Sequence, residues 1–163
     1  MGQELNQWTT GELPATIPIF PLTGVLLLPG GRLPLNIFEP RYLEMTEDAM
    51  STNRIIGMIQ PSDPYCRDFE PKTYDTGCAG EITEYEETED NRILITLSGL
   101  CRFDVVQELP RDEVSYRRVR AGYQSYECDL IRDNAMTLDR DNLIAALRNF
   151  FTARGMSADW SAI

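Results

Sequence analysis

The most informative absence in this 163-residue sequence is histidine, which does not occur at all. Histidine is the side chain whose ordinary pKa lies nearest neutral pH, so a histidine general base is excluded. Ser-His and Cys-His nucleophile pairs are excluded for the same reason, as are zinc sites that use imidazole. Lysine occurs once, as Lys72, between acidic residues that we expect to be exposed. A Ser-Lys dyad would need this amine to be desolvated, so the sequence does not favour one.

Phosphate-binding and nucleophile motifs are also missing. The sequence contains neither a G-x-x-x-x-G-K-[ST] loop nor a G-x-S-x-G elbow. The pair Gly30 and Gly31 is followed by a strand-like segment and not by a helix start, which argues against an anion site there. The four cysteines form no C-x-x-C pair, which argues against zinc and favours reduced thiols in the cytoplasm. We therefore expect no catalytic residue, no metal and no cofactor.

Positive charge is scarce, and this narrows the choice of partners. Fifteen Lys and Arg residues face 26 Asp and Glu residues, giving a net charge of −11. Such a balance opposes binding to nucleic acid and to anionic membranes. No run approaches the roughly 20 apolar residues that a membrane-spanning helix needs. Several carboxylates gather at residues 81–90, and we interpret this run as a solvated hairpin that discourages edge pairing.

Residues 17–50 are the most apolar part of the chain and the richest in proline and glycine. Residues 17–21 predict a short strand, and its prolines indicate one free edge, because proline cannot donate to a ladder. An apolar run at 25–28 ends in the turn signal Pro-Gly-Gly at 29–31. Alternating apolar residues at 33–37 then predict a second strand.

A helix is expected to begin at Pro40, because proline fits the first helical turn. Its apolar side repeats at helical spacing. The residues on that side are Tyr42, Met45, Thr46, Ala49 and Met50. Phe20, Phe38, Tyr42 and Phe103 are interpreted as core residues and not as a binding platform.

The rest of the chain reads as strands followed by a helix. Strands are predicted at 54–60, 74–87, 92–98, 101–105 and 114–123, the last with an extension to 129. Small residues at 77–80 indicate a close backbone approach or a bulge, and Gly99 is expected to break a strand. Apolar periodicity from Leu143 to Phe151 predicts a helix, capped by Asp139 or Asp141 and ended by Gly155. Ser157 and Asp159 suggest the start of another helix.

These signals divide the chain into three parts. Residues 1–14 are a flexible lead-in, residues 15–126 a β domain with one embedded helix, and residues 127–163 a helical extension that we expect to be truncated. The length suffices for one good core. The predicted fold class is therefore mostly β with helices (α+β).

The polar residues at the strand-to-helix junction are the candidate site. Glu39, Arg41 and Tyr42 could clamp a bound peptide. A structural interpretation stands beside this one: Glu39 would accept N–H groups of the helix start, and Arg41 would tie the helix to a neighbouring loop.

Several segments together resemble the N-terminal substrate-recognition domain of Lon proteases. They are IPIFPL at 17–22, LPLNIFEPRY at 33–42, GCAGEI at 77–82 and GLCRF at 99–103. The resemblance covers about residues 15–126 and implies a PUA-like pseudo-barrel with helices following it. It also implies a stand-alone, non-enzymatic protein of the peptidase S16-like group, without the ATPase and protease domains of Lon. Its partners would be polypeptide clients or a partner protein in protein quality control, engaged near Glu39, Arg41 and Tyr42.

Other functions stay open at this point. PUA-like folds include RNA binders, although the net charge argues against nucleic acid. A small-molecule site or a cryptic hydrolase site would need an apolar cavity with converging polar groups, and no sequence feature indicates such a cavity. The sequence also leaves open whether the protein associates with itself.

Overall fold

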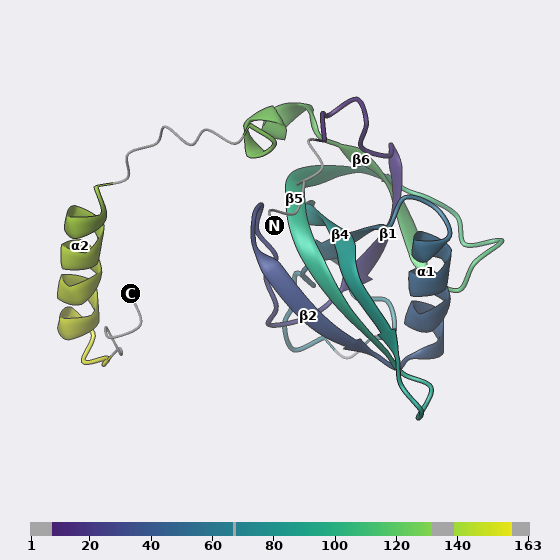
Figure 1. Cartoon of the computed structure of the whole chain (residues 1–163), viewed down its shortest axis with the longest axis horizontal. Coiled ribbons are helices and arrows are strands. Elements are labelled where there is room, and N and C mark those ends of the chain that lie inside the picture. Colours follow the sequence, from purple (N-terminus) through teal and green to yellow (C-terminus); the bar gives the residue numbers. More distant parts are fainter. Residues whose placement is uncertain (1–7, 67, 132–138, 158–163) are drawn as a thin grey trace, which may run out of the picture. The chain divides into compact units, whose positions relative to one another are not determined.

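The computed structural model of the chain describes residues 8–66, 68–131 and 139–157. The chain divides into two compact units, residues 1–131 and 132–163, and each is described by itself. The first unit is mostly strands with a few helices, which confirms the predicted fold class (Figure 1). Its elements are β1 (Thr16–Pro21), β2 (Arg32–Ile37), α1 (Pro40–Met50), β3 (Ile55–Ile59), β4 (Thr76–Glu87), β5 (Ile93–Glu108), β6 (Arg117–Gly122) and the 3-10 helix η1 (Gln124–Asp129).

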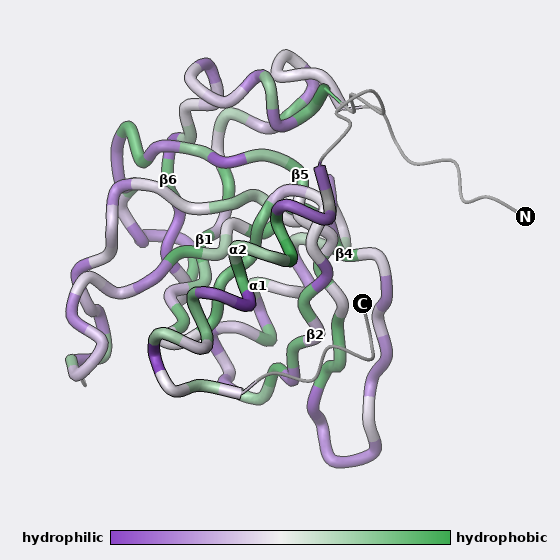
Figure 2. The backbone as a smooth tube through the Cα atoms, turned by 90° about the vertical axis from the view of Figure 1, so that its left-hand side faces the viewer, coloured by the Kyte–Doolittle hydropathy of each residue, from purple (hydrophilic) through white to green (hydrophobic). Residues whose placement is uncertain are grey.

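The strands form one sheet that closes on itself. Their order is β2-β5-β4-β3-β1-β6, and β5 also pairs with β6. β5 achieves this because it is 16 residues long: its first part lies between β2 and β4, and its last part pairs with β6. All pairings are antiparallel except that of β1 with β3. The hydrophilic tip between β4 and β5 is the acidic hairpin expected from the sequence (Figure 2).

The prediction that β1 has a free edge is wrong. β1 pairs with β3 on one side and with β6 on the other, so it is a central strand. Antiparallel ladders alternate hydrogen-bonded and non-hydrogen-bonded positions, and a proline fits where its nitrogen would not donate. Proline spacing alone therefore could not tell a central strand from an edge strand.

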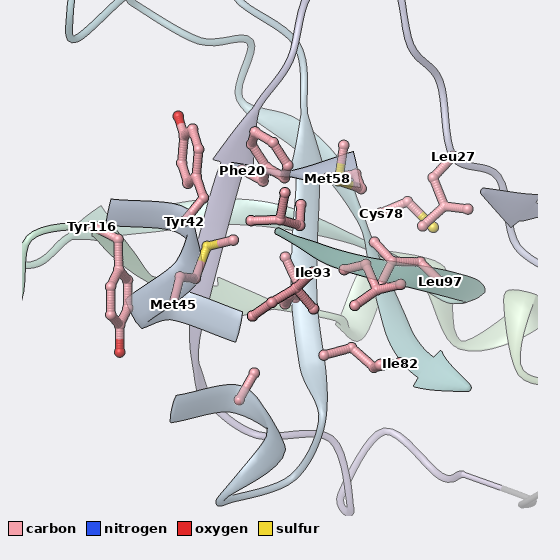
Figure 3. Close-up of a cluster of buried hydrophobic side chains, with 14 residues drawn as sticks. Phe20, Leu27, Tyr42, Met45, Met58, Cys78, Ile82, Ile93, Leu97 and Tyr116 are labelled. Atoms are coloured by element: carbon pink, nitrogen blue, oxygen red, sulfur yellow. The ribbon is translucent and has the colours of Figure 1, made fainter. Parts of the chain in front are cut away.

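Two apolar clusters lie on opposite faces of the strands. One surrounds Phe103, which is fully buried together with Ile17, Ile19 and Ile55. The other lies beneath α1 and contains the residues drawn in Figure 3. β3 contributes to both clusters, which is why all five of its residues are buried.

Two of the four aromatic core predictions concern this second cluster. Phe20 and Tyr42 are 7% and 6% exposed, and their ring centroids lie 4.1 Å apart. Phe103 belongs to the first cluster, as predicted for the core. The prediction for Phe38 is wrong, because this ring is 61% exposed and has Arg92 at 5.9 Å from its centroid. Phe38 follows the last residue of β2, where the strand's alternation between faces no longer determines burial.

The glycines of β4 and β5 behave differently from one another. A bulge between Ala79 and Gly80 confirms the irregularity predicted for that segment. Gly99, in contrast, does not end a strand, because β5 continues through it. A Cβ atom on Gly99 would lie 2.0 Å from the carbonyl oxygen of Leu28. The backbone at Leu28 packs so closely on β5 that only glycine fits at position 99.

The predicted extension of the last strand to residue 129 is also wrong. Residues 124–129 form η1, which packs against β5. Tyr126 and Leu130 turn toward the cluster around Phe103, and Tyr123 is buried in it. Alternation of apolar residues over so short a segment fits either a strand or a helical turn.

The second unit contains α2 (Arg140–Ala153), as the sequence predicts. Asp139 caps it, accepting a hydrogen bond from the Asn142 amide at 3.0 Å. Gly155 follows its end with a φ of 63°, the left-handed conformation that favours glycine. The helix predicted near Ser157 and Asp159 extends beyond the described residues. The predicted boundaries at 14 and 126 stay predictions.

Candidate functional site

The predicted site residues Glu39, Arg41 and Tyr42 lie together at the start of α1. The Arg41 guanidinium contacts the Glu39 carboxylate at 2.9 Å and donates to the carbonyl oxygen of Phe69 at 2.8 Å. Its central carbon lies 4.5 Å from the Tyr42 ring centroid and 4.0 Å from that of Phe69. The predicted tie between the helix and a neighbouring loop is therefore confirmed.

The predicted capping role of Glu39 is wrong. Glu39 occupies the N-cap position, but its side chain makes no capping hydrogen bond. The reason is that Arg41 engages the carboxylate in a charge-assisted bond. Pro40, the first helical residue, also has no N–H to offer.

The space around this junction is filled by the loop that Arg41 holds. Three arginines from different segments bind successive residues of that loop: Arg41 binds the Phe69 carbonyl, Arg111 the Glu70 carboxylate and Arg117 the Pro71 carbonyl. The cavity that remains has a volume of about 10 Å³, which holds roughly one water molecule. Burial raises the pKa of Tyr42, whose ring is 6% exposed.

A much larger apolar groove lies elsewhere on the same unit. Its volume is about 450 Å³, within the usual range for ligand pockets. One wall is the loop segment 25–28, and the other comes from the end of β3 and the residues leading into β4. Leu26, Leu28 and Tyr74 line it, although they are 66%, 55% and 55% exposed. The groove therefore presents apolar side chains to solvent.

The local sequence explains why this wall is apolar and exposed. Burial alternates along the segment, because Leu27 is only 4% exposed, whereas Leu26 and Leu28 on either side of it are 66% and 55% exposed. Figure 3 shows Leu27 beside Cys78 and Leu97, where it anchors the loop in the core. All four residues of the segment line the groove, and Leu26 and Leu28 are the most exposed of them.

Hydrogen bonds hold the two ends of the loop segment. Gln60 donates through Nε2 to the carbonyl oxygen of Val25 at 2.9 Å. At the other end, the Gly30 amide donates to the Gly99 carbonyl and the Gly99 amide donates to the Gly31 carbonyl, both at 2.8 Å. The groove wall is thus fixed by the backbone and not only by side-chain packing.

The residues Asp75, Thr76 and Arg102 add polar groups to the groove. Thr76 donates to Oδ1 of Asp104 at 2.8 Å, and the Tyr126 hydroxyl donates to the same oxygen at 2.8 Å.

Arg102 is bound by a carboxylate of η1. Its Nε and Nη2 atoms donate to the two oxygens of Asp129, each at 2.8 Å. The hydrogen bond from Arg102 lowers the pKa of Asp129 below its ordinary value. Arg102 also lies 4.6 Å from the Tyr126 ring centroid. The guanidinium is therefore neutralised within the protein.

The groove offers surfaces for binding and no activated nucleophile among its lining residues. Cys78 is 3% exposed, and burial raises the pKa of its thiol to about 12, so it stays protonated at neutral pH. Within residues 8–66, 68–131 and 139–157, no three His, Cys, Asp or Glu side chains gather in a way that could hold a metal ion. None of the helices in those ranges is long and apolar enough to cross a membrane.

Comparison with known proteins identifies the family of this chain. The model of the ATP-dependent protease La (LON) substrate-binding domain matches residues 16–154. The chain belongs to the Lon substrate-binding domain family. The family model describes the substrate-binding domain of that protease. The resemblance seen in the sequence is thereby confirmed.

Curated relatives are Lon proteases that are much longer than this chain. The protein from Dictyoglomus thermophilum is 31% identical over 107 residues, which are 66% of this chain and 13% of the relative. The protein from Anaeromyxobacter dehalogenans is 23% identical over 137 residues, covering 81% of this chain and 16% of the relative. The chain therefore spans less than a fifth of their length.

Solved structures agree on the fold. A Lon N-terminal domain protein from Xanthomonas campestris has a TM-score of 0.54 and 26% identity, covering 66% of this chain and 59% of that one. The N-terminal domain of Mycobacterium avium complex Lon protease also has a TM-score of 0.54. It is 12% identical and covers 86% of this chain and 69% of that one, so it supports the fold alone.

The groove is not predicted by the sequence, in which residues 25–28 are only an apolar run before a turn. The signal that could have indicated an exposed wall is four apolar residues in a row next to Pro-Gly-Gly, in a segment too short to bury both of its faces.

Proposed function

We propose that the groove beside residues 25–28 binds exposed apolar segments of polypeptides, and that the protein serves as a substrate-recognition module or adaptor. The observation that carries the proposal is the exposure of Leu26, Leu28 and Tyr74 around a groove of about 450 Å³. Contiguous exposed apolar surface usually marks an interaction site. The family is a substrate-binding domain, which supports the same function.

The module would act without chemistry of its own. The thiol of Cys78 is buried and protonated, and the groove presents mainly apolar side chains. Any hydrolysis of a bound client would come from an ATPase and protease acting with this domain. All four cysteines are free, which fits a reducing cytoplasm.

A peptide-binding role for Glu39, Arg41 and Tyr42 also stays a prediction, but the groove has the better geometry. The junction leaves a cavity of about 10 Å³ and its tyrosine is buried. A peptide could enter only if the loop around Phe69 moved away. The groove needs no such movement.

The test is binding of fluorescein-labelled casein, a largely unfolded protein, measured by fluorescence anisotropy. We expect Leu26→Asp to weaken binding about tenfold, because it places a charge on the apolar wall and removes a contact. Leu26 is 66% exposed, so the fold should tolerate the change.

Val106→Asp is the matched control, since Val106 is 63% exposed and lies outside the groove on β5. Both variants replace an exposed apolar side chain by aspartate, so they change the net charge by the same amount. Equal binding by wild type and Leu26→Asp, with an unchanged melting temperature, would contradict the proposed site.

A further inference from the structure

We infer that the groove selects apolar segments that are flanked by arginine or lysine. This inference rests on the proposed function and names the class of polypeptide that the groove takes. It comes from the polar groups associated with the groove, which carry more negative than positive charge.

The carboxylate of Asp75 is the accessible part of this site. Asp75 lines the groove and is exposed. Its backbone is held in place, because its carbonyl oxygen accepts a hydrogen bond from the Val105 amide at 2.7 Å. A flanking arginine or lysine of a bound segment could therefore pair with the carboxylate of Asp75, whose backbone is held in place.

Asp104 adds a second negative charge next to the groove. The Thr76 and Tyr126 hydroxyls both donate to its Oδ1 atom. These neutral donors orient the carboxylate without cancelling its charge. Asp104 and Thr76 are paired across β4 and β5, which places the carboxylate beside a lining residue.

The single arginine lining the groove does not reverse this balance. Arg102 is bound through two nitrogens to Asp129, so its charge is compensated inside the protein. A glutamate or aspartate on a client would have to compete with that bidentate pair. The carboxylate of Asp75 is left to contact a ligand, and the charge of Asp104 lies beside the lining residue Thr76.

The charge of the whole chain acts in the same direction. Its net charge of −11 attracts cationic segments at long range, and the groove concentrates that attraction beside an apolar surface. Segments rich in glutamate would be repelled both at a distance and in the groove. The protein would thus distinguish clients by the sign of the charge next to an apolar stretch.

The test uses two labelled peptides, Leu-Leu-Phe-Leu-Arg-Arg and Leu-Leu-Phe-Leu-Glu-Glu, titrated with the full chain and followed by anisotropy. At about 50 mM salt we expect the arginine peptide to bind about tenfold more tightly, and at about 500 mM salt most of this preference should vanish. We expect Asp75→Asn to reduce the preference about threefold.

Glu89→Gln is the matched control, because it removes the same charge from the exposed turn between β4 and β5. A smaller preference in Asp75→Asn but not in Glu89→Gln supports the inference. Equal losses in both variants would overturn it, since the preference would then come from the net charge alone.

The outcomes also separate this inference from the proposed function. If both peptides bind equally and Leu26→Asp abolishes binding of both, the groove binds apolar segments and the charge selection is wrong. If neither peptide binds at any salt concentration, the inference and the proposed function both fail.

Discussion

Asp129 joins η1 to β5 through one residue, Arg102. The backbone amide of Arg102 donates to Asp129 at 3.0 Å, and its guanidinium donates twice at 2.8 Å. The Asp129 side chain is only 9% exposed, whereas that of Arg102 is 44% exposed. Loss of the carboxylate would leave the Arg102 amide and guanidinium without this partner. The contact between η1 and β5 therefore depends strongly on Asp129.

We predict that Asp129→Asn lowers the free energy of unfolding at pH 7 by about 1–2 kcal/mol. The hydrogen bond from Arg102 lowers the pKa of Asp129 in the folded state. Its contribution is therefore present above the ordinary carboxyl pKa of about 4 and is lost as the pH falls through the lower, folded-state value. Urea unfolding at pH 7 and pH 3 should show the difference between the two proteins shrinking in acid. A difference independent of pH would contradict this account.

The loop that carries Phe69 shows how the elements are joined. Its described residues between 62 and 72, which exclude residue 67, contain only turns and bends, and the bridge between Pro61 and Thr73 closes it. Arginines from α1, from β6 and from the segment before β6 bind it. Such a loop is stable only as long as these side chains hold it.

Arg41→Ala should release this loop and leave the groove intact. We expect the free energy of unfolding to fall by about 1–2 kcal/mol, because a charge-assisted bond and an aromatic contact are lost. Hydrogen exchange of the amides in residues 61–75 should become faster, while affinity for the labelled casein stays unchanged. Arg120→Ala, an exposed arginine on β6, is the control.

The opposite result would be equally informative. If Arg41→Ala weakened casein binding as much as Leu26→Asp without affecting stability, the junction of Glu39, Arg41 and Tyr42 would be the peptide site. The alternative predicted from the sequence would then replace the groove.

On the scale of the whole molecule, the closed sheet makes the first unit self-sufficient. β5 links β2, β4 and β6, and both apolar clusters draw their residues from residues 1–131. The second unit is a separate compact unit containing α2. Domains with their own core can in general fold alone.

A shortened chain of residues 1–131 is therefore expected to fold and to bind. Its melting temperature should lie within about 5 °C of that of the full chain, since both apolar clusters lie within residues 1–131. Circular dichroism melting and casein titration measure the two properties. A shortened chain that fails to unfold cooperatively would show that the first unit depends on residues 132–163.

Much of the fold could be predicted because its signals are local. Pro40 at the first turn, the apolar periodicity of α1 and the Asp139 cap each involve residues within a few positions of one another. Several errors came where distant segments meet. Gly99 suggested a strand end, but it is required by the carbonyl of Leu28 packing on β5.

The sequence by itself determined the family, the positions of most strands along the chain and the exclusion of histidine chemistry, because motifs, periodicity and composition are properties of the chain alone. Only the tertiary structure decided that β1 is central and that Arg41, which also binds the distant Phe69 carbonyl, engages the Glu39 carboxylate so that it does not cap the helix. It also decided that Leu27 is buried while Leu26 and Leu28 form a groove. The physical reason is that strand pairing and burial depend on contacts between residues far apart in the sequence, which no local pattern specifies.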